Sequence, residues 1–287
     1  MNNCVNSSFE FVKQLGQELA SNDFDLPPFP DTALRVQDAL RDPDVDINRL
    51  GLIIMSEPTL AARLLRMANS VMMRRSGTME ITDINTAISR IGLTMVQNAA
   101  VSFAAREAFT TAAGSAMQER LERLRRHSVK VAAFAYMLGR KADYIGKADE
   151  AMLAGLLHSV GKFYILTRAE SFPELFADEA ALDELIAQWH SGVGRAIVES
   201  WGFPESIALA VDEHELLERG DMDAADVTDL VLVANLLATF PDEEHGRWEE
   251  LHGLPSLARM NLEGESLQAL VESSREDVAS MVSAMTG

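Results

Sequence analysis

The stretch LLHSVGK, residues 156–162, closes an apolar run with a histidine, a short polar break and a Gly-Lys pair. A histidine in this position is a candidate ligand for a metal or a phosphate. The next residue is Ser159, however, where a metal-dependent hydrolytic site would need a carboxylate. The stretch therefore belongs to an active site, to a reduced site, or to a helix end at which Ser159 makes a cap hydrogen bond and Gly161 is the C-cap.

Helical spacing of apolar residues extends in both directions from this stretch. Leu, Ala and Met are abundant and alternating β-branched runs are scarce, so the pattern predicts an all-α protein. Prolines between residues 26 and 31, Pro58 and the Ile91-Gly92 pair interrupt it. We expect a leader helix within 1–24 and further helices over 32–40, 47–58, 59–70, 84–109 (two helices), 117–139, 150–169, 182–204 (one kinked helix or a pair), 205–217, 226–240 and 265–285.

The last of these segments carries an apolar stripe at helical spacing. Its members are Leu267, Leu270, Val271, Val278, Met281, Val282 and Met285. Such a stripe is most often a packing face on its own chain, and we favour that interpretation. A face for a partner or for a homodimer remains open.

Composition narrows the class of protein. The chain has 287 residues, 47% of them hydrophobic, with 25 basic and 44 acidic side chains and a net charge of −19. This balance disfavours binding to nucleic acid or to an anionic membrane. Cys4 is the single cysteine, and no signal peptide or apolar run of about 18 residues occurs. We therefore expect a cytoplasmic protein.

Four of the six histidines lie on apolar faces of four different predicted helices. They are His127, His158, His190 and His214. In a helical bundle, such side chains could converge on one point in the core, where metal sites are often built. The alternative is that each is a hydrogen-bonded core residue, and no two of them have the i, i+4 spacing of a helical zinc motif.

Six segments occur in a fixed order: residues 26–70, which begin with LPPFPD and end with MANS, then ITDINTAISRIGL (81–93), RHSVKVAAFAYMLG (126–139), AGLLHSVGK (154–162), HSGVGRAIVESWGFPE (190–205) and VLVANLLA (231–238). Together they resemble the HDOD domain, the regulatory branch of the HD phosphohydrolase superfamily. The resemblance implies an all-α, two-lobed helical bundle over about residues 25–240. The N-terminal lobe would span about 25–112, the HD-like lobe about 118–240, and residues 241–287 would form a C-terminal helical extension.

The resemblance also implies which residue Ser159 replaces. HD hydrolases carry a lone histidine, a His-Asp pair, often further histidines, and a final aspartate. His127 matches the lone histidine and His158 the pair, and Lys162 matches the lysine that follows it. Ser159 and Asn235 stand at the two aspartate positions, and the later histidine positions match His190 and His214. The resemblance thus implies a degenerate site that keeps its imidazoles and loses both carboxylates.

That loss bears on the chemistry, because two closely spaced dications need anionic ligands to bridge them. The four histidines, His127, His158, His190 and His214, could still hold one Zn²⁺, Ni²⁺ or Fe²⁺. Asp212 or Glu213 would be a replacement carboxylate. No catalytic residue is assigned.

The leading hypothesis is a non-catalytic signal-transduction module that binds a partner protein or a small ligand. Its partners would be signalling proteins, including a receiver or output domain on another chain. One alternative is a metal-dependent phosphohydrolase acting on nucleotides or cyclic dinucleotides. The other is a sensor that binds a nucleotide or other phosphate through Arg126, His127 and Lys162 without cleaving it.

The arginines at 120, 123, 125 and 126 alternate with glutamates, and this charge pattern indicates a solvated helix face.

Overall fold

The computed structural model describes residues 10–18, 31–42, 45–73, 79–109, 116–141, 147–169, 171–172, 178–220, 224–239, 251–262 and 264–286. Over these ranges the fold is all-α, as the sequence predicts, and no strand occurs among them. Residues 10–18 are helical, and the helices that follow are α2 (Asp31–Leu40), α3 (Ile47–Met55), α4 (Pro58–Asn69), α5 (Ile84–Ile91), α6 (Leu93–Ala108), α7 (Ala116–Lys141), α8 (Ala148–Leu157), α9 (Val160–Ala169), α11 (Glu179–Ser200), α12 (Glu205–Glu213), α13 (Val227–Thr239), α14 (Pro255–Arg259), α15 (Glu265–Ser273) and α16 (Arg275–Thr286). The 26–30 segment of the LPPFPD motif lies outside the described residues.

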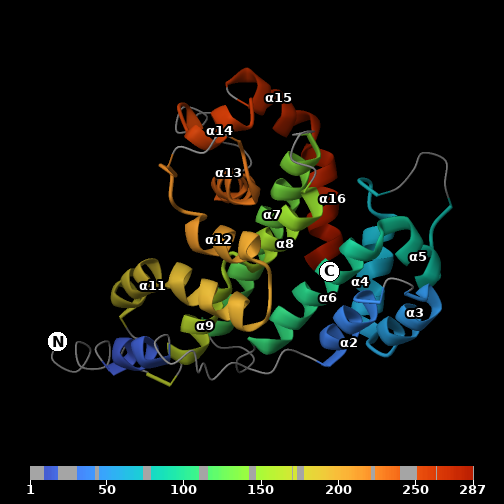
Figure 1. Cartoon of the computed structure of the whole chain (residues 1–287), viewed down its shortest axis with the longest axis horizontal. Helices are drawn as coiled ribbons and strands as arrows, with labels where there is room; N and C mark the ends of the chain where they lie inside the picture. Colours follow the sequence, from blue (N-terminus) through green and yellow to red (C-terminus); the bar gives the residue numbers. More distant parts are fainter. Residues whose placement is uncertain are drawn as a thin grey trace.

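The helices form two lobes (Figure 1). Helices α2 to α6 pack on one another at one side of the molecule, and α7, α8, α9, α11, α12 and α13 pack on one another at the other. Helix α6 also packs on α8 and joins the two groups. Local signals set the boundaries: Asp46 and Asp83 accept hydrogen bonds at the N-termini of α3 and α5, and Gly92, with φ of +85°, separates α5 from α6.

Close backbone contacts hold the second lobe together. Gly155 on α8 faces Ala132 on α7, and a Cβ at Gly155 would lie 2.8 Å from the Ala132 Cα. Gly161 lies in the first turn of α9 against α11, and its Cβ would lie 2.0 Å from the carbonyl oxygen of His190. The expectation that Gly161 is a C-cap is therefore wrong, because the glycine lets two helices approach closely. Similarly, α7 continues past Gly139 to Lys141, because Gly139 allows close contact with Ala148 of α8.

Over the described residues 251–262 and 264–286, the C-terminal extension contains the helices α14, α15 and α16. Helix α14 packs on α13, and the predicted 265–285 helix is divided at Ser274 into α15 and α16. Helix α16 packs on α7 and also on α4, so it contacts both lobes (Figure 1). The apolar stripe is directed inward, with Val271 and Val282 half-buried and the others buried. It is a packing face on the chain itself.

Among the described residues, none of the helices combines the length and the apolar character that a membrane crossing requires.

Residues 182–204, expected as one kinked helix or a pair, are one continuous helix, α11, up to Ser200. The chain then turns at Gly202, whose φ is +75°, before α12 begins.

Candidate functional site

The structure brings the four histidines into one row in the second lobe. His127 lies on α7, His158 at the end of α8, His190 on α11 and His214 just after α12. The ring centroids are 5.5 Å apart from His127 to His158, 4.9 Å from His158 to His214, and 5.3 Å from His214 to His190. His127 is half-buried and the other three are almost fully buried. The convergence arises because Gly155 and Gly161 let the helices that carry these residues approach closely.

Three of the imidazoles are oriented in the same way. The Nδ1 atoms of His158, His190 and His214 lie 2.7, 2.8 and 2.8 Å from backbone carbonyl oxygens three or four residues earlier in the chain. With each Nδ1–H donating to a carbonyl, the neutral form of each ring carries its lone pair on Nε2. This is the arrangement by which proteins orient metal-binding histidines.

The two positions without carboxylates use their side chains differently. The Ser159 hydroxyl lies 2.8 Å from His158 Nε2, to which it donates, and both residues are fully buried. Asn235, on α13, accepts at its Oδ1 from His127 Nε2 over 2.8 Å. Ser159 and Asn235 thus hydrogen-bond to the nitrogens through which His158 and His127 would otherwise bind a metal.

Glu215 is the carboxylate of the site, and our sequence interpretation did not include it. It directly follows His214, in the turn after α12. Its Oε1 atom lies 3.4 Å from His190 Nε2 and 3.5 Å from His214 Nε2, and it accepts from Lys162 Nζ at 2.7 Å. The two imidazole nitrogens are buried and have no hydrogen-bond partner among the described residues. Adjacency to His214 is a signal in the sequence that Glu215 shares with Glu213, so it does not single out Glu215.

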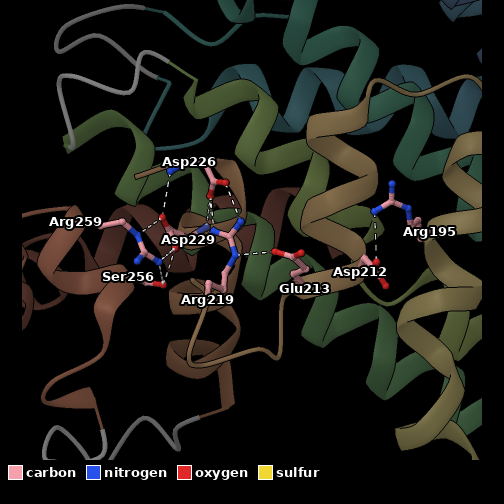
Figure 2. Close-up of polar contacts among 8 residues, drawn as sticks. All are labelled: Arg195, Asp212, Glu213, Arg219, Asp226, Asp229, Ser256 and Arg259. Carbon is pink, nitrogen blue, oxygen red and sulfur yellow. Dashed lines mark hydrogen bonds and ion pairs between the residues drawn. The ribbon is translucent and has the colours of Figure 1, made fainter. Parts of the chain in front are cut away.

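Asp212 and Glu213, the carboxylates expected as replacements, are directed elsewhere (Figure 2). Asp212 pairs with Arg195 Nη1 at 3.4 Å, and Glu213 accepts from Arg219 Nε at 2.9 Å. Helix α12 ends at Glu213, so both residues lie in its last turn, whereas Glu215 lies beyond it. The expectation for Asp212 and Glu213 is therefore wrong, because helix geometry turns them away from the histidine row.

Burial and charge set the protonation of the site. Burial lowers the pKa of His158 well below its ordinary value, and the neighbouring His214 lowers it further. Burial also lowers the pKa values of His127 and His214, against the opposing effects of Asn235 and Glu215, respectively. The rings of His190 and His214 hold the pKa of the Glu215 carboxyl far below its usual range, and Lys162 acts in the same direction. Glu215 is therefore ionised at neutral pH.

His190, His214 and Glu215 have the chemistry of a metal site. Each offers one ligand atom, and these three atoms lie within 4.8 Å of one another. A divalent cation would bind the Nε2 lone pairs of the two imidazoles in their neutral form, and it would add to Lys162 in offsetting the charge of the Glu215 carboxylate. Imidazole nitrogen and carboxylate oxygen suit Zn²⁺, Fe²⁺ and Ni²⁺. The residues therefore fit one divalent transition metal.

The residues considered for phosphate binding do not form a separate site. Lys162 is paired with Glu215, so its charge is used within the histidine row. Arg126 and Arg123 are exposed on α7, and Arg125 lies 3.5 Å from Glu122 one turn away. Arg120 pairs with Asp183 of α11. The expectation of a solvated helix face therefore holds for Arg123 and Arg126 but is wrong for Arg120 and Arg125, whose side chains are only 17% exposed, and Arg125 also donates to the carbonyl oxygen of Phe109.

Comparison with known proteins identifies the family. The HDOD domain model matches residues 26–217, about two thirds of the chain. A solved structure from Shewanella amazonensis, named "Putative metal-dependent phosphohydrolase", is 26% identical, covers 96% of this chain and 99% of its own, and has a TM-score of 0.78. An HDOD domain protein with unknown function from Geobacter sulfurreducens is 25% identical over 95% and 97%, with a TM-score of 0.70. The chain belongs to the HDOD domain family, and its fold is the two-lobed bundle of that family.

A curated relative is longer than this chain. It is an uncharacterized protein of Treponema pallidum, 24% identical over 246 residues, which are 80% of this chain and 45% of the relative. The chain thus spans less than half the length of that relative.

Proposed function

We propose that this protein is a non-catalytic regulatory module whose residual site binds one divalent transition metal. The observation that carries the proposal is the pairing of Ser159 with His158 and of Asn235 with His127. Both pairs use imidazole nitrogens that a two-metal centre would need, and neither supplies the negative charge that holds two dications close together. Hydrolysis of a phosphate ester by the two-metal route is not expected.

His190, His214 and Glu215 support the second part of the proposal. Their three ligand atoms would leave open positions on a bound ion, so the metal could take up a small ligand or a side chain of a partner. In this role the protein relays a signal by binding a partner protein or a small ligand. The protein partner would be a receiver or output domain on another chain. Leu216 and Leu217, exposed directly beyond Glu215, support a protein partner.

Metal content and turnover test this function together. The purified protein is analysed by plasma mass spectrometry after exposure to Zn²⁺, Ni²⁺ or Fe²⁺, and bis(p-nitrophenyl) phosphate and a cyclic dinucleotide serve as substrates. We expect one bound ion, lost in Glu215→Gln and kept in the matched control Glu218→Gln, which changes an exposed residue of the same turn. Two bound ions with sustained hydrolysis would contradict the proposal.

A further inference from the structure

The turn that carries Glu215 is closed by a buried arginine. Residues 215–218 are all exposed, whereas His214 and Arg219 at the two ends are buried. Arg219 Nε donates back to Glu213 over 2.9 Å, and the Leu216 N–H donates to the Glu213 carbonyl over 3.0 Å. The position of Glu215 is thus set by contacts at both ends of a loop of seven residues, 213–219.

Arg219 is in turn held from outside the loop. Its guanidinium donates to Asp226 over 2.7 and 2.9 Å and to Asp229 over 3.0 Å, with the Arg219 side chain only 4% exposed (Figure 2). These carboxylates raise the pKa of Arg219, against the effect of burial, so the charge is permanent. The loop is therefore fixed to the start of α13, where Asp226 and Asp229 lie.

Asp229 connects the loop to the C-terminal extension. Its side chain is fully buried and accepts from Arg259 Nε over 2.9 Å, from Arg259 Nη2 over 2.6 Å and from the Ser256 hydroxyl over 2.7 Å. Ser256 and Arg259 belong to α14 (Figure 2). Bidentate pairs between arginine and carboxylate are strong and fixed in geometry, so a displacement of α14 moves or unpairs Asp229.

We propose that the C-terminal extension positions Glu215 through the buried series Arg259, Asp229 and Arg219. Arg219 is a positioning residue of the site, and α14 is the element through which an event at the extension alters metal binding. This inference rests on the proposed metal function, but the mechanical connection from α14 to the turn does not depend on an ion. All three residues lie beyond the 26–217 segment that the HDOD model matches.

Two readouts on the full chain test the connection. The first is titration with Co²⁺ alone, followed through its visible absorption, which reports the coordination of the ion. Loss of a direct hydrogen-bond partner of a metal ligand typically weakens metal affinity about 10–100-fold, and because Arg259 acts on Glu215 only through Asp229 and Arg219, we expect Arg259→Ala to weaken it by about tenfold, the lower end of that range. The matched control is Arg195→Ala, because Arg195 pairs with Asp212 beside the turn but not with the turn itself (Figure 2). We expect its Co²⁺ affinity to stay within about twofold of the wild type.

The second readout is hydrogen exchange of the metal-free protein by mass spectrometry. We expect the peptide over residues 212–220 to exchange about tenfold faster in Arg259→Ala and to be unchanged in Arg195→Ala, while α8 peptides keep their protection. If Arg259→Ala does not fold, Arg259→Lys decides, since it keeps the charge beside Asp229 and loses the bidentate contact. Unchanged exchange at 212–220 would overturn the connection. If the wild type binds no Co²⁺ and Arg259→Ala still shows faster exchange at 212–220, the metal function alone is refuted and the connection stands.

Discussion

His158 shows how one buried side chain makes stability depend on pH. Its ring is fully buried, and burial lowers its pKa well below the ordinary value of 6.5. The unfolded chain binds a proton near that ordinary value, whereas the folded chain does not. The folded state is therefore favoured above pH 6.5 and loses stability as the pH falls below it. His127 and His214 act in the same direction.

We accordingly expect the metal-free protein to unfold at lower urea concentration at pH 5.5 than at pH 7.5. Each such histidine contributes at most about 1.4 kcal/mol per pH unit. In His158→Gln the difference between the two pH values should shrink, because one of the three groups is gone. An equal pH dependence in the variant and the wild type would show that His158 takes up its proton in the folded state.

At the scale of single residues, the sequence predicted which histidines come together, but it did not predict which carboxylate lies beside them. The four histidines, Ser159, Lys162 and Asn235 do meet, because each lies on an inward helical face or at a helix end. Glu215 could not be distinguished from Asp212 and Glu213 by sequence alone. The direction of each of these three carboxylates depends on the residue at which α12 ends and on the conformation of the turn that follows. The spacing of residues in the sequence determines neither of these two features.

At the scale of the helix, the contact of α9 with α11 depends on Gly161. A Cβ there would lie 2.0 Å from the His190 carbonyl oxygen, and backbone cannot move aside as a side chain can. We expect Gly161→Ala to lower the free energy of unfolding by about 3 kcal/mol or more, measured by urea denaturation. The row of histidines should also be disturbed, because His190 lies at the contact.

Gly192 provides the matched control for this prediction. It is an exposed residue inside α11, and a Cβ at this position would meet nothing within 4 Å. Replacing a glycine in the middle of a helix with alanine usually stabilises the helix, so Gly192→Ala should raise the free energy of unfolding by about 0.5–1 kcal/mol. Similar losses in both variants would mean that glycine at 161 serves no packing role.

Helix positions were largely predictable because prolines, aspartate caps and Gly92 act locally. The break at Ile91-Gly92 and the boundary between α3 and α4 near Pro58 followed from such signals, although Pro58 is the first residue of α4 and not the end of the preceding helix. Gly161 and Gly139 were misinterpreted, since a glycine that ends a helix and one that admits a neighbouring backbone look alike in sequence. The division of the last segment at Ser274 carried no proline or glycine signal, so one helix was expected where two occur.

For the whole molecule, α16 joins the two lobes by packing on α4 and α7. Met281 lies at the centre of its buried stripe and is 1% exposed. Met281→Ala should lower the free energy of unfolding by about 2–5 kcal/mol, as expected for deletion of a buried side chain. Ser283→Ala, on the exposed side of the same helix, should change it by less than about 0.5 kcal/mol. Equal small effects would show that α16 contributes little to the fold.

The buried hydroxyl of Ser159 also bears on how this chain could change over evolutionary time. A mutation to aspartate there would place a carboxylate where the side chain has no access to water, at a cost of several kcal/mol without a metal to neutralise it. Asn235 would have to change as well before two ions could bind. On stability grounds, a change from serine to aspartate at position 159 would therefore be unfavourable unless the binding of a second metal ion accompanied it.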